Sequence, residues 1–424
     1  MRETMMLLAG HSKVSDYKLN ITKKESWELF FVKGALETVR HTDTCDREVT
    51  VYVDHGEFRG DARFFVYPST TFSRKADLIQ EAVDKALLIK NQKYTLPGRE
   101  TGSFTVETDF DAHDPAELAA AIANAVFDAG TVEGTSLNAV EVFINKYTER
   151  VLNSRGLDKT QVRYTAMVEA IPTCGGGSVS VELYEQYNFN LLDQDALRRE
   201  IAGKLAEVKA RRQAITPGAI PPCKVILNAL DLSQLFWFLA DDLNYATVYG
   251  HSNVFSKGDR MQKAPTGDCL TFGMADAIRG NANSARIDSD GLSLRAQTLV
   301  RDGGVVGYYG SNRFGQYLGE DPTGSLRCLS AAAGTASRSN FETGPYLEVV
   351  SMSGLQVDLY SDYIGGEIRL AYYHDGQTLT PVTGISCSGS LSECLNRIRL
   401  SEEITTRDGY TGPAWAVLEG MKIY

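Results

Sequence analysis

The sequence predicts an α+β protein made of two parts. We expect the N-terminal part to be a sandwich-like α/β domain of antiparallel strands and helices, and the C-terminal part to be a mostly antiparallel β domain, either a large sheet or a barrel-like body. Three observations predict this class. Polar residues alternate with β-favouring residues over 14–66, helical periodicity with capping signals follows, and short glycine-punctuated strands dominate after a proline-rich break.

The length of the chain and the position of the break set the expected domain boundaries. A chain of 424 residues that is 43% apolar can form more than one hydrophobic core. The stretch "QAITPGAIPPC" at 213–223 holds three prolines and a glycine directly after a helical pattern. We therefore expect one domain over 1–213, a linker over 214–223 and a second domain over 224–424.

The first strands and the first helix are predicted from the spacing at which apolar residues recur along the chain. The runs "WELFFVKGALETVRH", "REVTVYVDHG" and "ARFFVYPST" alternate polar and apolar positions, which predicts three or more antiparallel strands. Helical spacing begins afterwards and predicts a helix over about 74–91, with Ser73 as its N-cap. The face expected to pack on the sheet consists of Leu78, Ile79, Ala82, Val83, Ala86 and Leu87.

The helix in "HDPAELAAAIANAVFDAG" has the clearest limits. Asp114 is a typical N-cap, Pro115 suits the first helical position, Glu117 completes the capping pattern, and Gly130 follows the last turn. More strands are expected at about 138–147, 161–171 and 178–188, with a turn at 153–156, and a long helix at about 194–213.

The C-terminal part is expected to begin with a strand at 225–227 and the apolar helix "LSQLFWFLADDL" at 232–243. Asp241 and Asp242 fall in its last turn, where the helix dipole disfavours a carboxylate. We expect them to contact a cation or a backbone donor beyond the helix end. Turn signals such as "RDGG" and "HDGQ" predict antiparallel hairpins, and one more short helix is expected at about 390–398.

Composition excludes some classes of function. The formal net charge of -11 and the pI near 5.2 argue against a general affinity for nucleic acid. The N-terminal apolar run "MMLLA" is too short for a secretory signal or a membrane span, so we expect a cytoplasmic protein. Seven scattered cysteines without a CxxC spacing predict reduced, mostly structural thiols.

Few residues have a pattern that is typical of catalysis or metal binding. No two of the six histidines have the i, i+4 or i, i+5 spacing that would present a pair to one metal ion. Asp288, Asp290 and Gly291 resemble the start of a calcium loop, but a strand follows where further ligands are needed, so a hairpin turn is the alternative. Cys174 precedes three glycines without the strand-to-helix turn of a nucleophile elbow.

Two arginines lie in "GSNRFGQYLGEDPTGSLR", which contains no GxGxxG or Walker pattern. A guanidinium group binds a carboxylate through two parallel hydrogen bonds, so Arg313 and Arg327 are candidates for a carboxylate clamp. The alternative role for either arginine is a surface ion pair.

The order of several segments resembles the TldD/PmbA family. "SDGLSLRAQTLVRDGGVVGYYGSNRFGQYLGEDPTGSLR" is similar to a family segment that runs from an Asp-Gly turn to a "tGsxR"-like motif. "SGLQVDLYSDYIGGEIRLAYYHDGQTLTPVTGISCSGSLSECLNRI" is similar to a later family segment. "ADLIQEAVDKALLIKNQKYTLPG", "VLNSRGL" and "LLDQDALRREIAGKLAEVKARRQAITPG" match the first half more loosely. The resemblance covers about residues 14–424. It rests on several segments that occur in the same order as in the family, and not on a single motif.

The resemblance implies one of two kinds of subunit. TldD-type members carry HExxxH on the first helix of the C-terminal domain, with a later cysteine as a further zinc ligand, whereas TldE/PmbA-type members lack this set. An alignment without gaps on the strand "CKVIL" places Trp237 at the first histidine, Phe238 at the glutamate and Asp242 at the second histidine. The C-terminal segment "TTRDGYTGPAW" contains no cysteine. The resemblance therefore predicts no catalytic residue and no metal ligand in this chain.

The resemblance also implies a function and partners. It predicts a TldE/PmbA-like subunit, inactive alone, that forms a heterodimer with a zinc-containing TldD-type chain and helps to enclose a peptide in proteolysis or peptide maturation. The family name "modulator of DNA gyrase" does not imply DNA binding. Two alternatives stay open. One is a self-sufficient metallopeptidase in which His251, Asp242 and Cys387 converge, and the other is a homodimeric peptide-binding protein without catalysis.

Overall fold

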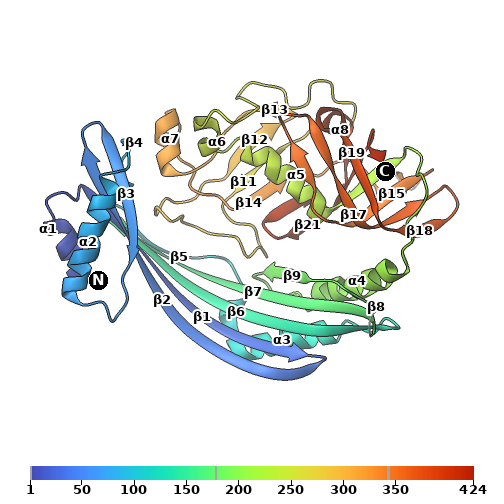
Figure 1. Cartoon of the computed structure of the whole chain (residues 1–424), viewed down its shortest axis with the longest axis horizontal. Coiled ribbons are helices and arrows are strands. Elements are labelled where there is room, and N and C mark those ends of the chain that lie inside the picture. The colour runs from blue at the N-terminus through green and yellow to red at the C-terminus, as the bar shows by residue number, and fades with distance from the viewer. Residues whose placement is uncertain (1, 177–178, 341–343) are drawn as a thin grey trace.

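The structure is a computed structural model that describes residues 2–176, 179–340 and 344–424. Its strands form three sheets, one in the N-terminal half and two in the C-terminal half, and none of them closes into a barrel within the described chain (Figure 1). The α+β class expected from the sequence is confirmed. No helix in the described part of the chain combines the length and the apolar character needed to cross a membrane.

The N-terminal sheet is built from long, mostly antiparallel strands in the order β4-β3-β2-β1-β6-β7-β5, with β8 and β9 pairing to β7. Its strands are β1 (Asp16–Val32), β2 (Ala35–His55), β3 (Phe58–Phe65), β4 (Asn91–Gln92), β5 (Thr101–Thr105), β6 (Thr135–Asn153), β7 (Asp158–Gly176), β8 (Val179–Glu182) and β9 (Glu185–Phe189). The strands are longer than the sequence patterns predicted, and Ser178, the first residue of one predicted strand, lies outside the described residues.

Alternation along these strands separates an apolar face from a polar face. In β1 the side chains of Leu19, Trp27 and Leu29 join hydrophobic clusters with the helices, while the intervening Lys18 and Glu28 belong to the opposite face. Helices α1 (Arg2–Gly10) and α2 (Phe72–Ala86) cover one end of the apolar face, and α3 (Pro115–Phe127) and α4 (Gln194–Gln213) cover the other end. The C-terminal half lies over the opposite face (Figure 1).

The C-terminal half contains two sheets with one helix packed against both. The first sheet has the order β20-β23-β10-β15-β17-β19-β24, and the second has the order β13-β12-β11-β14-β22-β21. Helix α5 (Ala229–Asp241) contacts strands of both sheets, and Leu232, Leu235, Phe236 and Leu239 are fully buried in the largest hydrophobic cluster. The apolar helix is therefore the core of this half.

The remaining strands of this half are short. They are β10 (Lys224–Asn228), β11 (Phe272–Ala275), β12 (Gln297–Arg301), β13 (Gly304–Val305), β14 (Cys328–Ala331), β15 (Tyr346–Met352), β16 (Gln356–Asp358), β17 (Tyr363–His374), β18 (Leu379–Val382), β19 (Ile385–Ser390), β20 (Arg399–Leu400), β21 (Ile404–Arg407), β22 (Tyr410–Pro413), β23 (Trp415–Leu418) and β24 (Lys422–Ile423). The hairpins expected at "RDGG" and "HDGQ" are present as β12–β13 and β17–β18. Two pairs, β10 with β15 and β14 with β22, are parallel.

Several helix limits differ from the expectation. Helix α3 has the predicted N-cap, because Asp114 accepts hydrogen bonds from the N–H groups of Ala116 and Glu117. Helix α2 instead begins after Thr71, whose side chain accepts from the N–H of Arg74, and it ends at Ala86. Ser73 is therefore not the N-cap.

Four α-helices of the described chain are shorter than ten residues. Helix α8 (Leu391–Arg397) was expected, whereas α1, α6 (Tyr245–Tyr249) and α7 (Asn312–Leu318) were not. The last two are five and seven residues long. Helical periodicity needs a longer window than this to stand out from a loop.

The segment 279–293 connects the C-terminal half to the polar face of the N-terminal sheet. Gln161 of β7 is 4% exposed and donates to the carbonyl oxygen of Ile287, while its own carbonyl accepts from the N–H groups of Arg286 and Ile287. Lys18 of β1 pairs with Asp290 at 2.5 Å. These contacts fix the position of one half relative to the other.

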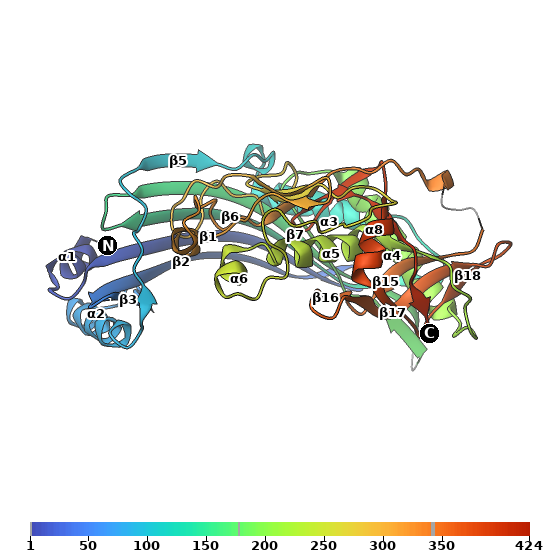
Figure 2. The ribbon, with the colours of Figure 1, turned by 90° about the horizontal axis from the view of Figure 1, so that it is seen from above.

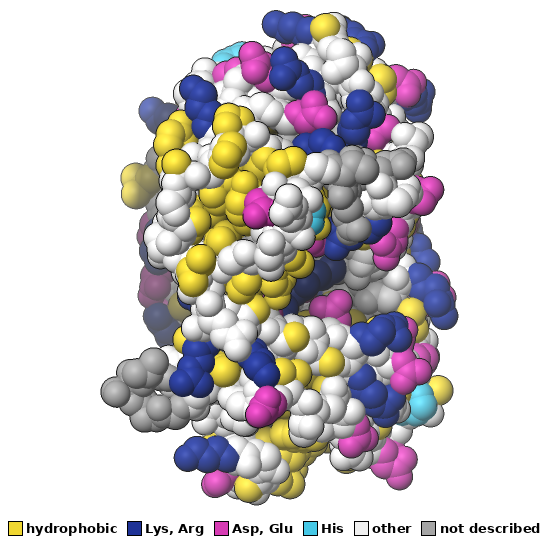
Figure 3. Space-filling model, turned by 90° about the vertical axis from the view of Figure 1, so that its right-hand side faces the viewer, with side chains coloured by type: hydrophobic (Ala, Val, Ile, Leu, Met, Phe, Trp, Pro, Cys, Tyr) yellow, Lys and Arg dark blue, Asp and Glu magenta, His cyan; other side chains and the backbone are white. Residues whose placement is uncertain are grey.

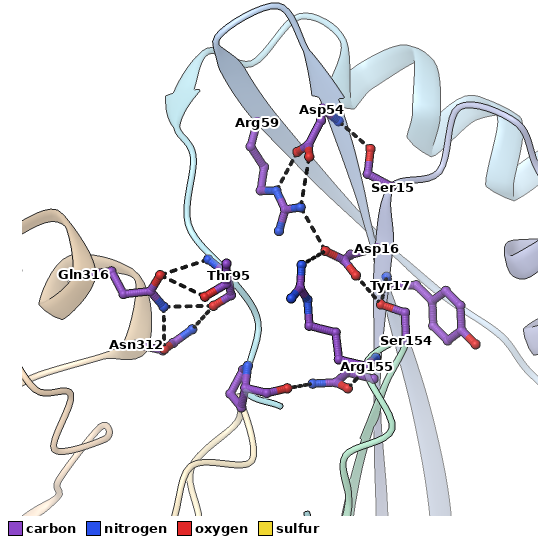
Figure 4. Close-up of polar contacts among 12 residues, drawn as sticks. Ser15, Asp16, Tyr17, Asp54, Arg59, Thr95, Ser154, Arg155, Asn312 and Gln316 are labelled. Carbon is purple, nitrogen blue, oxygen red and sulfur yellow. Dashed lines mark hydrogen bonds and ion pairs between the residues drawn. The ribbon is translucent and has the colours of Figure 1, made fainter. Parts of the chain in front are cut away.

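A second connection lies close to Lys18, near the start of β1 (Figure 4). The side chains of Asn312 and Gln316 on α7 donate to the carbonyl oxygen of Thr95, each at 2.8 Å. Beside them, the carboxylate of Asp16 accepts hydrogen bonds from Arg59 at 2.8 Å and from Ser154 at 2.5 Å. The start of β1, strand β3 and the β6–β7 turn are thereby held together.

Replacing Gln161 by Met tests the first connection. Met has a similar volume but cannot accept from Arg286 and Ile287, so buried polar groups lose their partner. We expect the free energy of unfolding to fall by about 2–3 kcal/mol. Urea unfolding followed by circular dichroism measures it. The matched control is Gln377→Met in an exposed loop, which should change stability by less than about 0.5 kcal/mol. Equal effects of the two substitutions would contradict the role of Gln161.

Candidate functional site

A cavity of about 420 Å³ opens between the polar face of the N-terminal sheet and the C-terminal half. Its walls come from β1, β2, β3, β6 and β7 on one side, and from the turn at 287–289 and Arg327 on the other. The lining residues are Asn20, Ile21, Thr22, Asp46, Glu48, Arg63, Phe65, Glu149, Arg150, Val151, Gln161, Ile287, Asp288, Ser289 and Arg327. No local sequence pattern predicted it, because its residues come from five strands and two distant loops.

One carboxylate of this cavity is held in an ion pair. Glu149 accepts from the guanidinium group of Arg163 at 2.9 and 3.0 Å and from Gln161 at 2.7 Å. Burial raises the pKa of Glu149, but the hydrogen bonds and charge of Arg163 outweigh it, so that the pKa is lowered overall. Glu149 is therefore ionised and fixed, and it is poorly suited to carry a proton in catalysis.

A second carboxylate at the wall belongs to a turn residue. Asp288 is 5% exposed and accepts from the N–H groups of Asp290, Leu292 and Ser325. Burial, followed by the nearby charge of Asp290, raises the pKa of Asp288. Gly291 has a φ of +78°, as a tight turn requires. The geometry is that of the predicted turn, because backbone N–H groups occupy the oxygens that a calcium ion would need.

The two candidate arginines differ in their surroundings. Arg313 donates to Asn91 at 2.7 Å and stacks on the rings of Tyr94 and Tyr317, so its guanidinium group is already engaged. Arg327 is exposed at the cavity wall, and no carboxylate of the described residues lies within 4.0 Å of it. Of the two, Arg327 is the one available to bind an anionic group.

Helix α5 shows one side to solvent. Its N-cap is Asn228, which accepts from the N–H groups of Leu230 and Asp231. Leu230 and Phe238 are 41% and 43% exposed, and Trp237 is half-buried against the main hydrophobic cluster. The solvent-facing side of α5 is thus apolar and aromatic at the positions where the sequence alignment places the first histidine and the glutamate of HExxxH.

Asp242, at the aligned position of the second histidine, directly follows α5. One carboxylate oxygen accepts from the N–H of Val254 at 2.7 Å and the other from the N–H of Phe255 at 2.9 Å. Burial raises the pKa of Asp242, and these two hydrogen bonds reduce that effect. The sequence-based interpretation of Asp242 as an acceptor for a backbone donor beyond the helix end agrees with this geometry, whereas Asp241 is exposed.

The groups that a divergent metal site would need are not brought together. Cys387 is buried in β19, and burial raises its pKa to about 11. His251 is exposed in the loop after α6, and Cys174 is buried in β7 between β6 and β8. Within 2–176, 179–340 and 344–424, no group of three His, Cys, Asp or Glu side chains is arranged to hold a metal ion.

A second cavity, of about 530 Å³, lies where β9 and α4 meet the β21–β22 hairpin. Arg407 lies 3.9 Å from both Glu185 and Glu200, and its guanidinium group stacks over Tyr187. Asn188 donates to Asp408 at 3.2 Å across the same junction. Viewed from one end, the molecule is hollowed between its two halves, with Lys and Arg side chains inside the hollow (Figure 3).

The sequence and the architecture were compared with those of known proteins, and the matches are as follows. A sequence model described as the PmbA/TldA metallopeptidase C-terminal domain matches residues 221–424. No curated protein matches the chain. Three similar solved structures are a proposed modulator of DNA gyrase from Bacteroides thetaiotaomicron, TldE from Thermococcus kodakarensis and a proposed modulator of a DNA gyrase from Thermotoga maritima.

The three structures cover nearly the whole chain at low identity. The TM-scores are 0.78, 0.78 and 0.75, with identities of 13%, 13% and 14%. The alignments cover 100%, 99% and 100% of this chain and 97%, 99% and 99% of the others. Likeness at this identity shows the fold alone, and the family model matches residues 221–424, just under half of the chain.

Asp231 on α5 gives a test that depends on pH. Its side chain is 3% exposed, and burial raises its pKa to about 6, which its hydrogen bond from Asn228 only partly offsets. The pKa of Asp231 is higher in the folded state than in the unfolded state. The contribution of Asp231 to stability is therefore largest below about pH 4 and is lost as the pH rises through 6. Asp231→Asn should therefore raise the free energy of unfolding at pH 7.5 by up to about 3 kcal/mol.

The gain should fall below about 1 kcal/mol at pH 4, where Asp231 is protonated in the folded state and about half protonated in the unfolded state. Urea unfolding at the two pH values measures the difference. Asp241→Asn is the matched control, since Asp241 is exposed on the same helix and its replacement should have little effect at either pH. A gain of equal size at both pH values would refute the assignment.

Proposed function

We propose that this chain is a member of the TldD/PmbA family and that it is the TldE/PmbA-like, non-zinc subunit of a peptidase complex. In this proposal a TldD-type chain supplies the zinc ion and its HExxxH ligands, and the present chain completes the space that holds the peptide. The substrates are peptides or unfolded polypeptides, and the complex works in the cytoplasm. The likeness to TldE from Thermococcus kodakarensis supports this assignment.

The observation that carries the proposal is the composition of the end of α5. Tryptophan and phenylalanine are not zinc ligands. Both oxygens of Asp242 accept from backbone N–H groups, so ligation would leave Val254 and Phe255 without their acceptor. The residues present do not fit a zinc ion.

The cavity between the two halves suits a polar, extended ligand. Its walls carry side chains of both signs, and Glu149 and Asp288 are held by groups of the protein itself. Arg327 is left to bind an anion, and a guanidinium fork matches a carboxylate group. We infer that Arg327 binds the terminal or side-chain carboxylate of the peptide, while the zinc-containing partner performs the hydrolysis.

Co-expression with a TldD-type chain from the same genome tests the proposal. The expected result is a stable complex that hydrolyses an unstructured peptide, with no hydrolysis by this chain alone. Inactivating the glutamate of the partner's HExxxH should abolish activity, whereas Phe238→Ala in this chain should leave most of it. Failure to form a complex, or hydrolysis that is the same with and without this chain, would contradict the proposal.

Arg327 gives a more specific prediction. Arg327→Ala should raise the KM of the complex for a peptide with a free C-terminal carboxylate by roughly tenfold, because a hydrogen-bonded charge pair is lost. The same peptide with an amidated C-terminus should change little. Arg301→Ala, on an exposed position of β12, is the control. An equal effect on both peptides would show that Arg327 does not bind the terminal carboxylate.

A further inference from the structure

The second cavity, between β9, α4 and the β21–β22 hairpin, lies on the inner side of the junction of the two halves. Figure 1 shows α4 below the C-terminal half, and Figure 2, seen from above, shows the two overlapping. Contacts of α4 with β17 and β18 of that half agree with both views. The volume of about 530 Å³ is in the range of cavities that bind small ligands.

Tyr187 of β9 lines this cavity and carries a hydroxyl group without a hydrogen-bond partner among the described residues. The side chain is 8% exposed, its ring belongs to the hydrophobic cluster under α3 and α4, and the guanidinium group of Arg407 lies over the ring. A buried hydroxyl group without a partner is unfavourable and rare in folded proteins. The Tyr187 hydroxyl is therefore available to a ligand.

Asn281 supplies a second group of this kind at the same cavity. It is 2% exposed, and its carboxamide oxygen accepts from the N–H of Asn283 at 2.9 Å. The other end of the amide group is therefore the NH₂ donor, and this Nδ2 has no partner among the described residues. The position of Asn281 is fixed, because its own N–H donates to Ile278 and the adjacent Gly280 accepts from the N–H of Asn190 at 3.3 Å.

The charges around the cavity decide which kind of acceptor suits Asn281. Four carboxylates and three guanidinium groups line it, from Asp193, Glu200, Glu403, Asp408, Arg199, Arg279 and Arg407. This balance is negative, so it disfavours an anionic acceptor and leaves a neutral carbonyl oxygen as the suitable one. A peptide main chain offers such carbonyl groups, together with N–H groups that a hydroxyl oxygen can accept from.

We propose that the second cavity binds the main chain of an extended peptide. One peptide carbonyl oxygen accepts from Nδ2 of Asn281, and a neighbouring peptide group bonds to the hydroxyl of Tyr187. Phe189, Leu191 and Leu197 of the lining offer apolar contact to a side chain. The inference rests on the proposed peptide role, and it adds an uncharged contact that does not depend on the peptide's sequence or on Arg327.

Both polar atoms are buried in the free chain, so the wall has to open slightly for the peptide. Arg407, which covers the ring of Tyr187, lies 3.9 Å from both Glu185 and Glu200. These distances are longer than a hydrogen bond. The side chain of Arg407 can therefore move aside without breaking a short contact to either glutamate.

Tyr187→Phe removes only the hydroxyl group. We expect the affinity of the isolated full chain for the neutral peptide N-acetyl-Ala-Leu-Ala-Ala-amide to fall by about fivefold, because one hydrogen bond is lost. Isothermal titration calorimetry measures it. The midpoint of urea unfolding should not fall, because the hydroxyl has no partner in the free chain. Tyr67→Phe, at an exposed position, is the matched control and should change neither quantity.

Asn281→Asp tests the second contact. It keeps the oxygen that accepts from Asn283 and replaces the NH₂ donor by another oxygen. Binding of the same peptide should weaken by at least about tenfold, because two acceptors then face each other. Tyr187→Phe decides the question by itself if the added charge prevents folding of Asn281→Asp.

Several results would overturn the proposal. These are the absence of binding at peptide concentrations up to about 5 mM, and equal affinity of the original chain and Tyr187→Phe. A lower unfolding midpoint of Tyr187→Phe would show that the hydroxyl has a partner in the free chain. Loss of binding in Arg327→Ala but not in Tyr187→Phe would place the peptide in the other cavity. The measurement needs no TldD-type chain, so it stays decisive even where the peptidase complex fails to form.

Discussion

The alternation of side chains along the long N-terminal strands is the constraint on which the rest of the structure depends. One face of the sheet is apolar and buries α1, α2, α3 and α4, so the opposite face must carry the polar residues. Lys18 and Gln161 belong to that polar face and bind the segment 279–293. A shift of one residue in register would exchange the two faces, and both the hydrophobic cores and the cavity would be lost.

Helix α5 links the fold to the proposed function. Its buried side holds the two C-terminal sheets together, which explains why the helix is so apolar. Its free side carries Trp237 and Phe238, and its end is tied to the loop 251–256 by Asp242. The helix is therefore a structural element of this half, and neither tryptophan nor phenylalanine is a zinc ligand. This agrees with a role in which the chain shapes the peptide site and its partner performs the chemistry.

Sequence reasoning predicted the elements whose limits are set locally. Asp114 and Pro115 determine the start of α3 through the first helical turn alone, and the prediction was correct. Helix α1 was missed because its nine residues gain their stability from contacts with α2, such as the pair of Glu3 with Lys75. The N-cap of α2 was wrong because Thr71 and Ser73 are both suitable residues, and only the backbone decides between them.

The candidate site was harder to predict than the fold. The assignment of Arg327 to a carboxylate clamp was one of two alternatives, and nothing in its neighbourhood in the sequence shows that it faces Glu149 across the cavity. The cavity itself joins segments that are more than a hundred residues apart. Local patterns carry no information on such contacts, whereas the resemblance to a family gave the expected kind of subunit.

Zinc binding by the isolated chain tests the central claim most directly. The full chain, stripped of metal and then incubated with one equivalent of zinc, is examined by metal analysis after gel filtration and by thermal unfolding. The account predicts far less than one zinc ion per chain and an unchanged unfolding temperature. One tightly bound zinc ion per chain, with a clear rise of the unfolding temperature, would contradict it and would favour a self-sufficient metallopeptidase.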